Sequence, residues 1–76
     1  MKVFRNTNEY FGEPGPFESD SKEALATEMQ STFDVWADEE SRNDEWWDGE
    51  RNTFDRDAWM ANCRAEFIAA LEEVTP

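Results

Sequence analysis

The chain has 76 residues, with 19 Asp and Glu against 7 Lys and Arg, which gives a formal net charge of −12. This length allows one domain. A single cysteine without any histidine excludes an internal disulfide and argues against a zinc site. Six Phe, four Trp and one Tyr set the chain apart from acidic disordered tails, which are poor in aromatic residues because they build no core. We therefore expect one folded domain over residues 1–76 that holds its charge outward.

Residues 1–18 are irregular and rich in Phe, Gly and Pro. Two short apolar clusters, residues 2–5 and 9–11, flank the turn-favouring triplet at residues 6–8. This arrangement fits either a small β-hairpin or an extended arm whose aromatic side chains pack on helices, and the sequence leaves both open.

Residues 21–39 have the spacing of an amphipathic helix. The apolar side chains recur at intervals of four, four and three residues and so share one face: Leu25, Met29, Phe33 and Trp36. Asp20 is placed to cap this helix, with Glu23 as its capping-box partner. The acids at its C-terminus oppose the helix macrodipole, and a local cost of this kind marks a candidate functional segment.

Residues 54–73 predict a second helix, with Thr53 as its cap. The apolar face of this helix comprises Trp59, Cys63, Phe67, Ala70, Leu71 and Val74. Because Cys63 lies within that face, we interpret it as a small core residue and not a reactive thiol.

The predicted fold class is mainly α, with a small α+β fold as the alternative. The two helices pack antiparallel within residues 19–76. One side of the pair is covered by the aromatic residues of the first segment, Phe4, Tyr10, Phe11 and Phe17.

Between the helices, Trp46 and Trp47 are adjacent, and adjacent helical residues point roughly 100° apart. We therefore expect one Trp to cover the core and the other to be partly exposed. Asp44, Asp48 and Asp55 also fall at positions of an EF-hand calcium loop, but Trp46 occupies a ligand position and cannot ligate. An acidic loop with a turn glycine is the favoured interpretation, and we predict no metal site.

The residues needed for common enzyme chemistry are largely missing. Histidine, the commonest general base at neutral pH, is absent, and three glycines form no phosphate-binding loop. We predict a protein that is not an enzyme and uses no cofactor. The first twenty residues hold no signal-peptide apolar segment, and no run reaches the roughly 20 apolar residues of a membrane span, so we expect a cytoplasmic protein with no membrane partner.

The acids are densest on the first helix and its exit: residues 6–41 hold ten acids and one base, Lys22. Duplex DNA of ~30 Å presents about 18 phosphates, a number close to the 19 carboxylates of a chain expected to be about that long. A groove that binds phosphates through Lys and Arg could accept such a surface. The predicted contact residues are Glu28, Asp34, Asp38, Glu39, Glu40, Asp44, Glu45, Asp48 and Glu50, with Trp46 or Trp47 as an anchor.

The segment Phe33-Asp34-Val35-Trp36-Ala37-Asp38-Glu39-Glu40 resembles the acidic, Trp-bearing helices of small phage proteins that inhibit host defence by imitating DNA, the anti-CRISPR and antirestriction inhibitors. The resemblance is one of kind and covers about a tenth of the chain. It implies a stoichiometric inhibitor, a monomer or small homo-oligomer acting in the host cytoplasm. Its partner would be a basic nucleic-acid-binding protein or complex, such as a CRISPR surveillance complex or restriction enzyme, and not nucleic acid itself.

The same composition also fits two different kinds of protein. An acidic neutralising module of the antitoxin or immunity type would use the same electrostatics on a basic nuclease. Acidity could also be an adaptation to high salt, which two Lys against five Arg would fit and the many aromatic residues fit less well.

Overall fold

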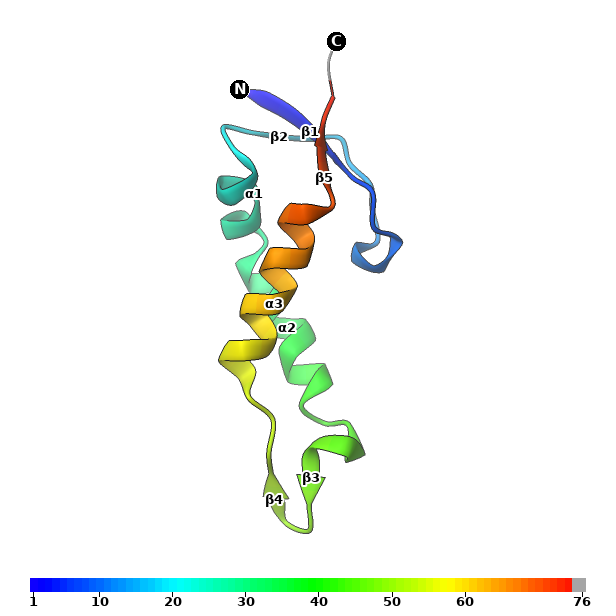
Figure 1. Cartoon of the computed structure of the whole chain (residues 1–76), viewed down its shortest axis with the longest axis vertical. Coiled ribbons are helices and arrows are strands. Elements are labelled where there is room, and N and C mark those ends of the chain that lie inside the picture. The colour runs from blue at the N-terminus through cyan, green and yellow to red at the C-terminus, as the bar shows by residue number, and fades with distance from the viewer. Residues whose placement is uncertain (75–76) are drawn as a thin grey trace.

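The computed structural model describes residues 1–74 and shows a rod, with a small sheet at one end and a hairpin at the other (Figure 1). Its extents are 53 × 19 × 16 Å, and its radius of gyration is 14.6 Å, against roughly 11 Å for a compact chain of this length. The elements in chain order are β1 (Lys2–Asn6), η1 (Glu9–Phe11), β2 (Phe17–Ser19), α1 (Lys22–Glu28), α2 (Gln30–Glu40), η2 (Asp44–Trp46), β3 (Trp47–Asp48), β4 (Arg51–Asn52), α3 (Arg56–Ala69) and β5 (Leu71–Glu73).

The fold class is α+β, so the prediction of a mainly α fold with two helices is wrong. Within residues 1–74 there are three α-helices and five strands, and the strands form two antiparallel sheets. The larger sheet has the order β2-β1-β5, with Val3 opposite Glu18 and Arg5 opposite Glu72. The two-stranded sheet pairs β3 with β4.

The N-terminal segment forms a hairpin, but its turn is not at residues 6–8. Asn6 stays in β1 and is buried, and the connection to β2 runs through residues 7–16. The Asn6 Oδ1 accepts a hydrogen bond from the Asn8 backbone N–H at 2.9 Å, and its Nδ2 donates to the Phe67 carbonyl at 3.4 Å. Asn8 in turn caps η1 by accepting from the backbone N–H of Tyr10. The polar triplet thus anchors the strand to α3 and begins a 3-10 turn.

The predicted second helix is too long at its C-terminal end. α3 stops at Ala69, and Leu71–Glu73 form β5, which pairs with β1 through Asn6↔Leu71 and Phe4↔Glu73. The change from helix to strand is stabilised by Thr7, whose backbone N–H and hydroxyl both donate to the Ala70 carbonyl at 2.8 Å. Leu71 therefore remains on the core side while the backbone leaves the helix to complete the sheet.

The predicted helix over residues 21–39 exists, but it is divided at Met29 into α1 and α2. Ser21, not Asp20, caps α1, because the Ser21 hydroxyl accepts from the Ala24 N–H at 3.0 Å. Likewise Asp55, not Thr53, caps α3 by accepting from the Ala58 N–H at 3.1 Å. In both cases the cap lies within two residues of the predicted one.

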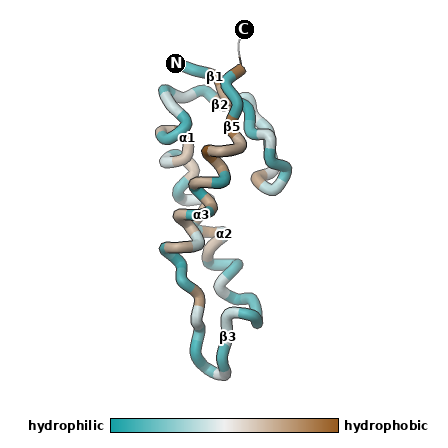
Figure 2. Tube along the Cα trace, viewed as in Figure 1, coloured by the Kyte–Doolittle hydropathy of each residue, from teal (hydrophilic) through white to brown (hydrophobic). Residues whose placement is uncertain are grey.

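The core lies between the sheet and the three helices. Its buried members are Phe4, Phe11, Leu25, Ala26, Phe33, Cys63, Phe67 and Leu71, with Met29, Trp36 and Trp59 among the half-buried residues packed against it. Eight residues of the two predicted apolar faces are in one of these two groups: Leu25, Met29, Phe33, Trp36, Trp59, Cys63, Phe67 and Leu71. Ala70 is not part of the core, and Val74 is exposed. Figure 2 shows hydrophobic residues along α3, whereas the chain around β3 is mostly hydrophilic. The hairpin end of the rod lies beyond this core and is held by polar contacts and by the aromatic contacts of Phe54 with Trp46 and Trp59.

Candidate protein-binding surface

The end of the rod opposite the three-stranded sheet is formed by residues 38–52, here named the acidic tip (Figure 1). It comprises the last residues of α2, the η2 turn and the β3–β4 hairpin. Gly49 closes the hairpin with φ +64°, a left-handed value that glycine adopts without steric cost. Seven acids and two arginines lie in this segment, so its formal net charge is −5.

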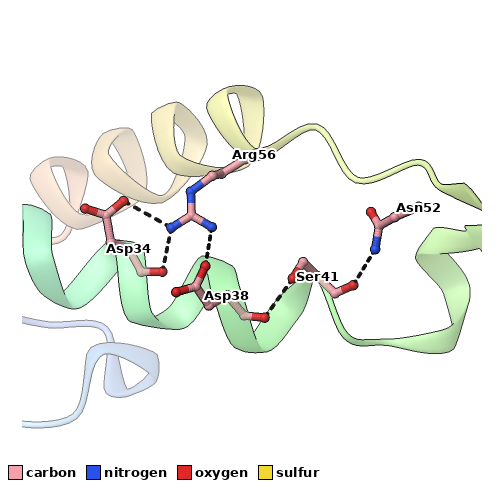
Figure 3. A network of polar contacts seen from close by, with 5 residues as sticks. All are labelled: Asp34, Asp38, Ser41, Asn52 and Arg56. Atoms are coloured by element: carbon pink, nitrogen blue, oxygen red, sulfur yellow. Dashed lines mark hydrogen bonds and ion pairs between the residues drawn. The ribbon is translucent and has the colours of Figure 1, made fainter.

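Hydrogen bonds hold the acidic tip to the helices. The Asn52 Nδ2 donates to the Ser41 carbonyl at 2.8 Å, and the Ser41 hydroxyl donates to the Asp38 carbonyl at 2.7 Å (Figure 3). The Thr53 backbone N–H and hydroxyl both donate to the Trp46 carbonyl, at 2.6 and 2.8 Å. These bonds connect the exit of α2 to the approach to α3 and fix where the acids of the tip lie.

The two tryptophans differ in exposure as predicted, but neither of them packs against the core described above. Trp46 is half-buried, its ring packs edge-on against Phe54 at 5.2 Å, and its indole Nε1–H donates to Glu40 Oε1 at 3.1 Å. Trp47 keeps 46% of its surface exposed. Trp47 is therefore the better placed of the two to contact a partner.

Arg56, in the first turn of α3, joins α3 to α2 through Asp34 and Asp38 (Figure 3). One guanidinium nitrogen lies 3.2 Å from Asp34 Oδ1 and 2.9 Å from the Asp34 carbonyl, and the other bonds Asp38 Oδ1. The hydrogen bonds that the guanidinium donates to Asp38 and, secondly, to Asp34 raise the pKa of Arg56. These two predicted contact residues thus have a partner within the fold, and part of their charge is neutralised there.

The remaining predicted acids have no ion pair within residues 1–74. Glu39, Asp44, Glu45, Asp48 and Glu50 are exposed, and all lie in the acidic tip. Glu28 is also exposed but ends α1, so it lies apart from the tip. The structure therefore brings most of the predicted set together and leaves Glu28 outside it.

Sequence reasoning missed Arg56 and Tyr10. Asp34 and Asp38 are one helical turn apart and so lie on the same face of α2. An arginine at the start of an antiparallel helix lies opposite the end of α2, so the sequence did contain a signal for the Arg56 contact. Tyr10 was expected to cover the core, yet 62% of its surface is exposed, and its ring stands beside Trp36 at a centroid distance of 6.0 Å. No sequence signal placed Tyr10 next to the acids of α2.

The calcium alternative is not supported by the backbone. Residues 47–52 form a β-hairpin and not a loop wrapped around an ion, and Asp55 caps α3. Across the described part of the chain, no group of three or more Cys, Asp or Glu side chains is arranged to hold a metal ion. Burial raises the pKa of the Cys63 thiol, with a smaller contribution from Glu66, and the residue is 4% exposed. Cys63 is therefore a poor nucleophile and behaves as a core residue.

No family model matches the chain, and neither a curated protein nor a solved structure is significantly similar to it. None of the helices in residues 1–74 combines the length and the apolar composition needed to cross a membrane. Arguments about function therefore rest on the geometry and charge of the rod itself.

Proposed function

We propose that this protein is a non-enzymatic inhibitor that presents an acidic, nucleic-acid-like rod to the basic nucleic-acid-binding groove of a host defence complex. The observation that carries the proposal is the outward display of charge on a narrow body. Seventeen of the 19 acidic side chains are exposed and the other two, Asp34 and Glu40, are half-buried. Only four of the 19 form an ion pair within residues 1–74. The surface thus keeps most of its anionic charge available to a partner.

The spacing of this charge refines the comparison with DNA. The rod is 53 Å long, not the ~30 Å expected for a compact chain, and duplex DNA of that length carries about 31 phosphates. Nineteen carboxylates along 53 Å correspond to roughly one per 2.8 Å, which lies between duplex DNA at about 1.7 Å and one of its strands at about 3.4 Å. The rod therefore does not match a short duplex in number of charges, and its linear charge density favours a groove that accepts a single strand or a partly unwound duplex.

The acidic tip supports the same proposal because it combines charge with an apolar anchor. Exposed Trp47 lies between Glu45 and Asp48, and aromatic residues are over-represented among those that dominate binding energy. A phosphate backbone offers no such anchor, so Trp47 would give the protein an advantage over the nucleic acid that it displaces.

A neutralising module of the antitoxin or immunity type would use the same exposed acids on a basic nuclease. The two functions differ in whether the partner's contact surface is its nucleic-acid groove. Competition with duplex and single-stranded DNA therefore separates them.

The test is a pull-down from bacterial lysate with the tagged protein, identified by mass spectrometry and repeated with excess duplex or single-stranded DNA. Two matched variants accompany it. The tip variant carries Glu45→Lys, Asp48→Lys and Glu50→Lys, and the control variant carries Glu9→Lys, Glu13→Lys and Glu18→Lys. All six residues are exposed and lack an ion pair in the described chain, so both variants change the net charge equally and spare the Arg56 contacts.

We expect a nucleic-acid-binding complex that DNA displaces, with capture lost in the tip variant and largely retained in the control variant. A partner indifferent to DNA would replace the proposal with a dedicated neutraliser. Equal loss in both variants would show that net charge, and not the acidic tip, governs binding. No partner at all would favour acidity as an adaptation to salt.

A further inference from the structure

An open groove of about 380 Å³ lies where η1 meets the C-terminal half of α2. Its lining residues are Tyr10, Trp36, Glu39, Glu40 and Asn43. Two of these are aromatic and two are acidic, and they come from segments that are far apart in the sequence. The proposed function uses the charge of Glu39 and Glu40 as part of the acidic tip but does not say what the groove itself binds.

The aromatic walls of the groove are held in place by the core. Tyr10 and Trp36 meet edge-to-face at a centroid distance of 6.0 Å and an interplanar angle of 70°. Both rings also contact Phe11, which is 6% exposed, at 5.3 Å for Tyr10 and 6.0 Å for Trp36. Because buried Phe11 contacts both rings, Tyr10 keeps its position although most of its surface is exposed.

The acidic wall carries charge that the described chain does not neutralise. Neither Glu39 nor Glu40 forms an ion pair within residues 1–74, and Arg56 is engaged by Asp34 and Asp38. Glu40 Oε1 accepts a hydrogen bond from the Trp46 indole at 3.1 Å, which orients that carboxylate. The groove therefore offers aromatic rings and uncompensated carboxylates to one ligand at the same time.

We infer that this groove binds an arginine side chain of the basic partner protein. A cation over an aromatic face is attracted by the ring quadrupole, and a guanidinium is planar, weakly hydrated and able to stack on a ring. Its forked N–H groups also bond carboxylates in pairs, which an ammonium group cannot reproduce. The inference rests on the proposed function in one respect, namely that the partner is a basic protein.

A short peptide tests the groove without the partner. Ac-Gly-Arg-Gly-NH₂ is titrated into ¹⁵N-labelled protein at low ionic strength, and ¹H–¹⁵N spectra are recorded. Peptides with lysine and with uncharged citrulline in place of arginine are the matched ligands. We expect saturable shifts at the Trp36 indole N–H and at the backbone amides of residues 10, 39, 40 and 43, stronger for arginine than for lysine and absent for citrulline.

Three variants complete the test. Tyr10→Leu removes the ring but keeps apolar volume, and it should weaken arginine binding about threefold or more, in line with the loss of a cation–π contact. Glu39→Gln should weaken binding as well, whereas Glu13→Gln, which changes the net charge equally outside the groove, should leave it unchanged. Spectra of the free variants report whether each one folds.

Equal shifts for arginine and lysine, or shifts that spread over all acidic residues without saturating, would overturn the inference. So would an affinity that falls equally in the Glu39 and Glu13 variants. The pull-down tests the proposed function and the titration tests the groove, so either proposal can fail without the other. A DNA-displaced partner without peptide binding would leave the proposed function standing, and peptide binding without such a partner would leave only the groove.

Discussion

Replacing Phe11 with Ala should destabilise the whole domain, because this side chain is the one that the β1–β2 connection buries in the core. Phe11 is the one buried residue among residues 7–16. Its ring meets Phe67 at 5.2 Å and Phe33 at 6.4 Å, both edge-to-face, besides its contacts with Tyr10 and Trp36. Removing it takes away both a hydrophobic side chain and the aromatic partner of four other rings.

The expected loss is large relative to the total. A Phe→Ala change at a buried site costs about 3–5 kcal/mol, and a 76-residue domain has a total stability of roughly 4–11 kcal/mol. Phe11→Leu keeps most of the apolar volume and loses chiefly the edge-to-face contacts, so it should cost about 1–2 kcal/mol. The leucine variant keeps the prediction testable if the alanine variant does not fold.

The assay is urea unfolding followed by far-UV circular dichroism, which reports the helices and not the local environment of a tryptophan. With a slope of about 1.5 kcal/mol per molar urea, the midpoint should fall by about 2–3 M for Phe11→Ala and about 1 M for Phe11→Leu. Trp47→Ala, at the exposed tip, should leave the midpoint nearly unchanged and is the matched aromatic control. A midpoint for Phe11→Ala close to that of the native chain would refute the packing of residues 7–16 described above.

Three further predictions concern the charge and the titratable groups. Screening of the unpaired acids should raise the melting temperature by about 5 °C between 0.1 and 1 M NaCl, roughly 1 kcal/mol, and a chain unfolded at 0.1 M would instead indicate adaptation to salt. Partial burial of the Tyr10 side chain, followed by the charges of Cys63, Glu40 and Glu66, raises its pKa, so absorbance at 295 nm should show this single tyrosine ionising above pH 10. The proton is held more tightly in the folded state, so stability should fall as pH rises past 10. Denaturation should bring the titration back to 10.0, and identical curves in both states would contradict this. The Cys63 thiol should react with a disulfide reagent at least tenfold faster in urea than in the native state, and equal rates would show that it is not buried.

The helices could be predicted because their apolar residues repeat with helical spacing, and this pattern alone selected the interface. The strands could not be predicted in the same way. Leu71 reaches the core whether the chain stays helical or becomes extended, so its apolar character does not distinguish the two. The choice is made by β1, whose free edge and neighbouring Thr7 side chain lie near the opposite end of the sequence. No residue near Met29 breaks a helix by itself, and the structure offers no local reason for the division there.

For the candidate surface, the sequence predicted features that depend on residues close together in the chain. The adjacency of Trp46 and Trp47 indicated one half-buried and one exposed ring, but the half-buried ring packs on Phe54 and not on the core as expected. The Arg56 contacts and the Tyr10 groove depend on how α2 meets α3 and η1, so they required the packing of distant segments. The compact size assumed from chain length also failed, because the polar hairpin extends the rod beyond its core.

The path of the chain allows the length of the rod to be changed by lengthening two helices. The acidic tip is joined to the rest of the molecule only through α2 and α3, which run side by side in opposite directions (Figure 1). Inserting seven residues into each helix would move the tip by about 10.5 Å at 1.5 Å per residue while leaving the sheet untouched. Because Glu39, Glu40 and Asn43 belong to both the acidic tip and the groove, lengthening the helices would also move these residues away from Tyr10. Partner binding that survives the lengthening would therefore show that the tip is recognised without the groove.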